Sequence, residues 1–173
     1  YNFYRKNFKK FKKDIFLIPK DHVLYVADNL GYIYAINLKS KSLIWAKNYG
    51  IPFRSNLKFA SGQLFLANQD NTIYSINPVN GEKKWQFATA LTFLKTDFKN
   101  NFVIDKSSNS LFFLNTSGEL YSINFINQKI NWVMNFKTSS LASDTDLFLS
   151  LPIVLRDANL LIVTENSLLN YNF

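Results

Sequence analysis

Four acidic residues in the C-terminal part of the sequence form its densest group of metal-ligating side chains. They are Asp144, Asp146, Asp157 and Glu165. The run ASDTD places two carboxylates two residues apart, and a calcium-binding loop uses oxygen donors at alternate positions in this way. Such a loop also needs a glycine for its sharp turn and a closing glutamate, and neither follows at the required spacing. We therefore expect a solvated loop here and predict no metal site.

Nucleophilic and thiolate chemistry have few possible residues in this chain. The sequence contains no Cys, which excludes disulfides, thiol nucleophiles and thiolate metal sites. His22 is the single histidine, and nothing near it in the sequence completes a metal cluster or a nucleophile pair. Ser61 and Gly62 predict a hairpin turn and lack the spacing of a phosphate-binding loop. We predict no catalytic residue, and we expect His22 to cap the turn into the following strand.

The net charge of +8 is concentrated at the N-terminus. Six of the twenty basic residues lie among the first thirteen positions, interleaved with Phe3, Phe8 and Phe11: Arg5, Lys6, Lys9, Lys10, Lys12 and Lys13. Such a segment can lie on an anionic lipid surface and gain about 1 kcal/mol per basic residue, which would give a peripheral membrane contact. We favour the alternative, an edge strand and linker whose lysines discourage aggregation. The remaining chain is close to neutral, so no nucleic-acid partner is predicted.

Length and composition favour one compact, strand-rich domain. Of the 173 residues, 47% are hydrophobic and 18% are charged, as expected of a globular protein. Aromatic residues make up 17%, and their rings pack well on the pleated surface of a β-sheet. No apolar run approaches the roughly 20 residues that a membrane-spanning helix needs. Because the sequence begins at Tyr1 without a Met, we expect a processed chain or an excised fragment, from which a signal peptide or a lipidated Cys could have been removed.

A 22-residue pattern occurs three times without gaps, at residues 24–45, 64–85 and 111–132. Each copy places an Ile-Asn pair eight residues before a Trp, and the resulting pairs are Asn37 and Trp45, Asn77 and Trp85, and Asn124 and Trp132. A fourth, degraded copy covers residues 160–173, with Asn172 in the Asn position. Successive Asn positions are 40, 47 and 48 residues apart. A period in this range, with several strands per unit, is typical of propeller blades.

Each repeat unit can be divided into four antiparallel strands. In the second unit they are expected at residues 55–60, 63–69, 72–77 and 83–89. In the third of these strands, Tyr74 and Ile76 should face one side of the sheet, and Ile73 and Ser75 the other. The connecting turns end in Gly or Asn, which tolerate positive φ. These turns are DNLG (28–31), NQDN (68–71), PVNG (78–81) and NTSG (115–118).

The Trp and Asn residues of the repeat are expected to be structural. Each Trp should begin an outer strand, where its ring can cover apolar surface between neighbouring sheets. Each Asn should end the preceding strand and hydrogen-bond its own turn. The segment YRKNF (4–8) is similar to WAKNY (45–49) and WVMNF (132–136), so Tyr4 takes the place of the Trp. The predicted structural residues are Tyr4, Trp45, Trp85, Trp132, Asn37, Asn77 and Asn124.

The repeat resembles the PQQ-type propeller repeat, which occurs in quinoprotein dehydrogenases and in BamB, a lipoprotein of the outer-membrane barrel assembly machinery. The similarity rests on a Leu-Tyr strand, a turn, the run [LI]-Y-[AS]-I-N and the Trp eight residues later. It is best over residues 56–88, good over 22–136 and weak over 140–173. The segment WAKNYGIPFRSNLK (45–58) also resembles BamB-type propellers.

The resemblance implies an all-β propeller of four-stranded antiparallel blades. We expect a single propeller domain over residues 1–173, with blades at approximately 10–49, 50–90, 91–137 and 138–173. Family members usually carry about eight blades, and residues 1–9 are expected to form an outer strand. Three arrangements stay open: this strand completes the last blade of the same chain, it completes a blade across a homodimer through unpaired blade strands, or the chain is a segment of an eight-bladed protein.

Two functions are compatible with the resemblance. A PQQ enzyme needs calcium ligands and basic residues around the quinone, and the family's enzymes often carry a vicinal disulfide, which a chain without Cys cannot form. A PQQ- or metal-binding relative of the dehydrogenases is therefore the alternative. We favour a non-catalytic protein-binding scaffold without a cofactor on the periplasmic side of a bacterial envelope, lipid-anchored in its full-length form. The outer-membrane barrel assembly machinery would be its partner. Arg54, between an outer strand and the next inner strand, is the predicted partner-binding residue.

Overall fold

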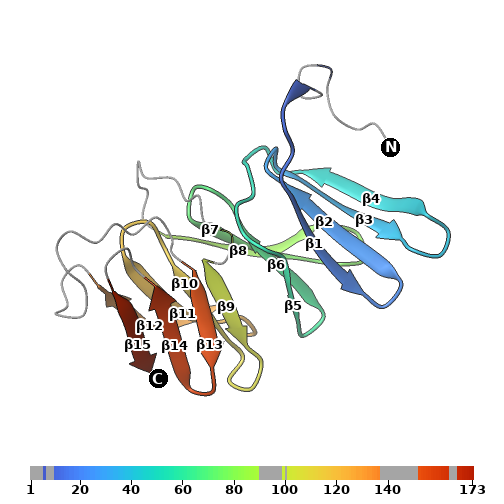
Figure 1. Cartoon of the computed structure of the whole chain (residues 1–173). Helices are drawn as coiled ribbons and strands as arrows, with labels where there is room; N and C mark the ends of the chain where they lie inside the picture. The colour runs from blue at the N-terminus through green and yellow to red at the C-terminus, as the bar shows by residue number, and fades with distance from the viewer. Residues whose placement is uncertain (1–5, 7–9, 90–98, 100, 137–151, 164–166) are drawn as a thin grey trace. The chain divides into compact units, whose positions relative to one another are not determined.

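A computed structural model describes residues 6, 10–89, 99, 101–136, 152–163 and 167–173. Within these residues the chain forms four antiparallel sheets, which confirms the predicted all-β class. The chain divides into two compact units, Tyr1–Phe87 and Ala88–Phe173, and two sheets belong to each (Figure 1). In the part of the chain described here, no helix is long and apolar enough to cross a membrane.

The first unit contains two four-stranded sheets. The first sheet has the order β1-β2-β3-β4. Its strands are β1 (Ile15–Lys20), β2 (Val23–Asp28), β3 (Tyr32–Asn37) and β4 (Ser42–Asn48). The second sheet has the order β5-β6-β7-β8. Its strands are β5 (Lys58–Ala60), β6 (Gln63–Ala67), β7 (Thr72–Ile76) and β8 (Lys83–Ala88).

The second unit contains the third and fourth sheets. The third sheet consists of β9 (Phe102–Asp105), β10 (Ser110–Leu114), β11 (Glu119–Asn124) and β12 (Lys129–Asn135). The fourth consists of β13 (Ile153–Arg156), β14 (Asn159–Val163) and β15 (Leu168–Asn172), in that order. Among the described residues this last sheet therefore has three strands, not four. The repeat spacing would place its Trp-bearing strand beyond residue 173.

The Trp of each outer strand stands inside the strand and not at its beginning, which corrects the prediction. Trp45 is the fourth residue of β4, Trp85 the third of β8 and Trp132 the fourth of β12. In two sheets a β-bulge lies directly before the Trp and moves it one position further along the strand. Ala35 pairs with Trp45 but Ile36 pairs with Leu43, so one residue of β4 is left over, and the same shift occurs before Trp132. A bulge increases the local twist and redirects the next side chain, here the indole.

Each unit has its own apolar core, located between its two sheets. In the first unit, the first sheet contributes Phe16, Tyr25, Ala27, Ile33, Ala35 and Trp45, and the second contributes Leu64, Leu66, Tyr74 and Ile76, with Phe53 and Leu57 from the preceding connection. In the second unit, the core consists of Phe112, Leu114, Leu120, Phe136, Ile153, Leu160, Ile162 and Leu169, with Trp132, Met134 and Tyr171 packed against it. Burying such side chains stabilises each pair of sheets by about 1.5–3 kcal/mol per large residue.

Candidate functional site

The turn between the second and third strands of the first three sheets is built around a buried Asp or Asn. These residues are Asp28, Asn68 and Asn115. In every case Oδ1 accepts hydrogen bonds of 2.9–3.0 Å from the backbone N–H groups two and four residues later. The turns end as predicted in a residue of positive φ: Gly31, Asn71 or Gly118. Because the side chain satisfies the backbone donors, these turns form a fixed base for the connections between sheets.

In the first unit, the connection of residues 49–57 is bound to two of these turns. Tyr49 N donates to Gly31 O at 2.8 Å, and Phe53 N donates to Asp28 O at 3.3 Å. On the second sheet, Gln69 N donates to Pro52 O at 2.9 Å. The connection is thus hydrogen-bonded to the ends of both sheets of this unit, and it forms a surface with little freedom to rearrange.

Three aromatic rings, two of them from the connection itself, pack against one another here. Tyr49, Phe53 and Tyr74 lie with their ring centroids 5.3–6.1 Å apart in edge-to-face arrangements. Tyr49 Oη donates to Gly81 O at 3.0 Å. Burial raises the pKa of Tyr49 to about 12, with smaller contributions from Tyr74 and Glu82, and burial also raises the pKa of Tyr74. Both phenols therefore stay neutral at physiological pH and act as packing and hydrogen-bonding groups.

Arg54 lies in the middle of this connection, between two fully buried neighbours, Phe53 and Ser55. Its backbone N donates to Ala67 O at 3.0 Å, and Ser55 Oγ accepts a 2.6 Å bond from Ala67 N. The Arg54 side chain is half-buried, and its Nε is buried without a hydrogen-bond partner. The fold therefore holds a cationic donor in place at the end of the two sheets and leaves one of its N–H groups unsatisfied.

Sequence reasoning missed Tyr49, although the repeat contained the signal. Tyr49 and Phe136 occupy the same place, four residues after a Trp, in WAKNY and WVMNF. Both backbone N–H groups donate to the glycine of a neighbouring turn, Gly31 or Gly118, at 2.8 and 2.9 Å. This aromatic residue thus fixes the chain directly after β4 and after β12, whereas Thr89 stands at the same place after β8.

The repeat Trp residues lie within the sheets and at their contacts. The Nε1 of Trp45 donates to Pro78 O at 2.9 Å, on the turn between β7 and β8. The Nε1 of Trp85 donates to Gln63 Oε1 at 3.2 Å within its own sheet. The ring of Trp132 lies 5.3 Å from that of Tyr171, between the third and fourth sheets. The contacts of all three Trp side chains are those of residues that pack the sheets.

The repeat Asn residues hydrogen-bond the turns that follow them. Asn37 Oδ1 accepts bonds from Lys39 and Ser40, and Asn77 Oδ1 accepts one from Val79. Asn124 Oδ1 accepts bonds from the N–H groups of the second and third residues after it. The amide oxygens of these side chains thus accept hydrogen bonds from the backbone of the hairpin turns. Tyr4, the remaining predicted structural residue, lies outside the described residues.

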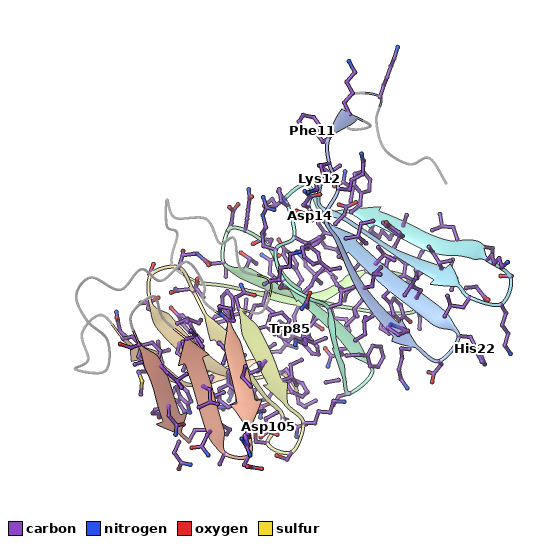
Figure 2. All side chains as sticks on the ribbon, in the orientation of Figure 1. Phe11, Lys12, Asp14, His22, Trp85 and Asp105 are labelled. Atoms are coloured by element: carbon purple, nitrogen blue, oxygen red, sulfur yellow. The ribbon has the colours of Figure 1, made fainter. Side chains whose placement is uncertain are left out.

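The candidate metal ligands and the histidine are not brought together in the described parts of the chain. Asp157 lies in the short turn between β13 and β14, while Asp144, Asp146 and Glu165 lie outside the described residues. Among the described side chains, no group of three or more His, Asp and Glu could hold a metal ion. Figure 2 shows His22 at the hairpin between β1 and β2, at the opposite end of the first sheet from Asp14.

The basic N-terminal segment is described only in part. Lys6, Lys10 and Lys12 are exposed, and the side chain of Phe11 is 59% exposed. Phe11 and Lys12 lie beyond the Asp14 end of β1 (Figure 2). The other residues of this segment, Phe3, Arg5, Phe8 and Lys9 among them, are outside the described set.

Comparison with protein families identifies the family of this chain. The family model described as outer membrane protein assembly factor BamB matches residues 7–171. The chain belongs to this family. A search of curated proteins gave no match.

Solved structures share the fold at low sequence identity. The BamB of Moraxella catarrhalis aligns at a TM-score of 0.73 and 10% identity, over 92% of this chain and 49% of that one. The quinohemoprotein alcohol dehydrogenase of Comamonas testosteroni aligns at 0.57 and 12%, over 69% and 20%. The computationally designed Ika4 protein aligns at 0.67 and 8%, over 95% and 94%. The likeness confirms the predicted propeller class, and the chain spans about half the length of the Moraxella BamB.

Proposed function

We propose that this chain is a non-catalytic protein-binding scaffold of the bacterial envelope, with a BamB-like role in outer-membrane protein assembly. Membership of the BamB family supports this role, and so does the surface built by residues 49–57 and the two turns beneath it. The observation that carries the proposal is Arg54, a cationic side chain on a fixed connection whose buried Nε has no hydrogen-bond partner.

A fixed connection favours binding because little conformational entropy is lost when a partner docks. The 49–57 connection is hydrogen-bonded at Tyr49, Pro52, Phe53 and Arg54, so its backbone is already ordered in the free chain. Arginine is enriched among the residues that dominate interface energies because its planar guanidinium can bind a carboxylate or several carbonyl oxygens at once. A partner that supplies such an oxygen would satisfy the Arg54 donors.

The partner we propose is a component of the outer-membrane barrel assembly machinery, bound on the periplasmic side of the membrane. A full-length form with a lipid anchor would hold the scaffold close to that partner. This chain covers about half of the Moraxella BamB chain. It would therefore supply about half of the binding surface that a chain of that length could offer.

Binding of the purified 173-residue chain to the membrane-embedded assembly protein of the same genome tests this role. Biolayer interferometry should show that Arg54→Ala weakens binding at least about tenfold, and that Arg54→Lys restores only part of it because the planar donors are lost. Lys83→Ala, which removes an exposed charge from the start of β8, is the matched control and should leave affinity unchanged.

Equal affinity of the parent and Arg54→Ala would overturn the assignment of Arg54, and absence of any binding would overturn the proposed partner. The alternative function, a PQQ- or metal-binding relative of the dehydrogenases, predicts a different result. In that case PQQ with Ca²⁺ would quench the Trp fluorescence of the chain saturably.

A further inference from the structure

The turn between β7 and β8 contains the single Asn-Gly pair of the sequence, Asn80-Gly81. An Asn side chain deamidates when the backbone nitrogen of the next residue attacks its Cγ and closes a five-membered ring. Glycine allows this attack best, because it has no side chain to hinder the approach and its backbone is the least restricted. Asn80 is exposed, so water reaches the turn.

The same backbone conformation occurs in the equivalent turns of the first and third sheets without a glycine. Lys41 and Gln128 take the place of Gly81, four residues after the repeat Asn, and all three have a positive φ, of 55°, 64° and 73° respectively. The backbone N–H of Gly81 donates to Asn77 O at 2.8 Å, and that of Gln128 donates to Asn124 O at the same distance. The turn by itself therefore does not require a glycine at this place.

Packing against the first sheet is what requires Gly81. A Cβ at this residue would lie 2.7 Å from Cζ3 of the Trp45 ring, which leaves no room for a side chain. The same turn accepts the Trp45 Nε1 hydrogen bond at Pro78 O and the Tyr49 Oη hydrogen bond at Gly81 O. The contact between the two sheets thus keeps Asn80 next to the residue that allows deamidation best.

The Asn80 side chain is already turned toward the following backbone. Its Oδ1 accepts a hydrogen bond from Glu82 N at 3.1 Å, and its Nδ2 donates to Glu82 Oε2 at 2.9 Å. The first of these bonds brings the side-chain carbonyl group over the Gly81 peptide. Asn127 in the third sheet makes the same bond to the N–H two residues later, at 3.0 Å, but its next residue is Gln128. The two turns therefore differ chiefly in the residue that would attack.

We infer that Asn80 is a site of spontaneous deamidation, and that the modification weakens the contact between the first two sheets. The Gly81 nitrogen first leaves its hydrogen bond to Asn77 O, loses its proton and attacks Asn80 Cγ. The Cγ–Nδ2 bond then breaks, the leaving nitrogen takes up a proton, and ammonia departs from a succinimide. Water opens the succinimide at either carbonyl group, which leaves aspartate or isoaspartate.

Both products disturb the turn that holds Trp45 and Tyr49. Isoaspartate adds one carbon to the main chain directly before Gly81, so Gly81 O and the space beside the indole are displaced. Aspartate and isoaspartate alike replace the Nδ2 donor by a carboxylate, which faces the like charge of Glu82. The inference depends neither on the proposed partner nor on Arg54.

Peptide mapping by mass spectrometry tests the site after incubation of the purified 173-residue chain at mildly alkaline pH. We expect Asn80 to convert from amide to acid at least about tenfold faster than Asn127, because only Asn80 precedes a glycine. Electron-transfer fragmentation should identify isoaspartate among the products. An unchanged Asn80, or equal rates at Asn80 and Asn127, would overturn the assignment of the site.

Urea denaturation of the converted form, separated by ion exchange, tests the effect on the sheets. Its urea midpoint should be lower than that of the fresh parent. Asn80→Ser is the matched control, because Ser40 stands at this place in the first sheet, and this variant should keep its midpoint through the same incubation. Asn80→Asp adds the charge alone, so its midpoint should lie between those of the fresh parent and of the isoaspartate form. An isoaspartate form with the midpoint of the fresh parent would refute the effect on the contact.

Discussion

Replacing Gly81 by Ala tests the contact between Trp45 and the second sheet. A Cβ at Gly81 would lie 2.7 Å from Cζ3 and 2.8 Å from Cδ2 of the Trp45 ring, closer than carbon atoms approach without displacement. The ring is also tied to this turn, because its Nε1 donates to Pro78 O at 2.9 Å. The indole therefore cannot move away from the new methyl group without weakening that hydrogen bond.

Two effects add up in this variant. Gly81 has a φ of +73°, and an L-residue in this region is strained by about 1–2 kcal/mol. Overpacking against the indole adds about 1–3 kcal/mol. Gly62 separates the two effects, because it has a φ of +67° and nothing within 4 Å of its added Cβ. Gly62→Ala should therefore show only the backbone strain, and the excess of about 1–3 kcal/mol in Gly81→Ala should come from Trp45.

Urea denaturation followed by far-UV circular dichroism measures both variants at one fixed protein concentration. The excess should disappear when both glycine substitutions are repeated in a Trp45→Leu background, because the ring is then absent. If Gly81→Ala loses no more free energy of unfolding than Gly62→Ala, the indole does not occupy the turn. The same conclusion follows if the excess persists without the ring.

Three further predictions concern stability. Asn68→Ala removes the acceptor of the buried Thr72 N–H and the partly buried Asp70 N–H and should lower the free energy of unfolding by about 1–3 kcal/mol, whereas Asn37→Ala, at an exposed turn, should lower it by about 0.5–1.5 kcal/mol in the same urea titrations. Burial raises the pKa of Tyr49 from 10.0 to about 12, so the unfolded chain loses this proton first. Stability should then fall as the pH rises from 10.0 to about 12, and urea titrations of Tyr49→Phe should lack that part of the pH dependence. Leu57→Ala should lower the unfolding free energy by about 2–5 kcal/mol, and Leu17→Ala by less than about 0.5 kcal/mol, because Leu57 is buried and Leu17 is exposed.

The features that depend on neighbouring residues could be predicted from the sequence. The alternation in residues 72–77 placed Tyr74 and Ile76 on one face, and both lie in the core between the first two sheets. The turn chemistry is equally local, because a four-residue hairpin that ends in Gly or Asn needs a positive φ at that residue, as Gly31 and Asn71 show. Strand positions followed from these signals within a few residues.

The features that depend on contacts between sheets could not be predicted in this way. The bulge before Trp45 leaves no separate sequence signal, because it arises from the register between β3 and β4. The buried Nε of Arg54 results from its two buried neighbours on a connection whose path is set by both sheets. The exposure of Leu17 is a further example, because the repeat gives it the same character as the buried Leu57.

The polar residues of the repeat and of the connection should respond to substitution in opposite ways. The side chain of Asn68 is engaged by the backbone of its own turn, so its loss should destabilise the sheet and leave the affinity of the folded chain for its partner unchanged. Arg54 has an unsatisfied Nε, so Arg54→Ala should weaken partner binding while changing the free energy of unfolding little. Paired measurements of affinity and urea stability on both variants separate the two roles. A loss of affinity in Asn68→Ala that matches that of Arg54→Ala would place the turn itself in the interface, and the connection would then not act alone.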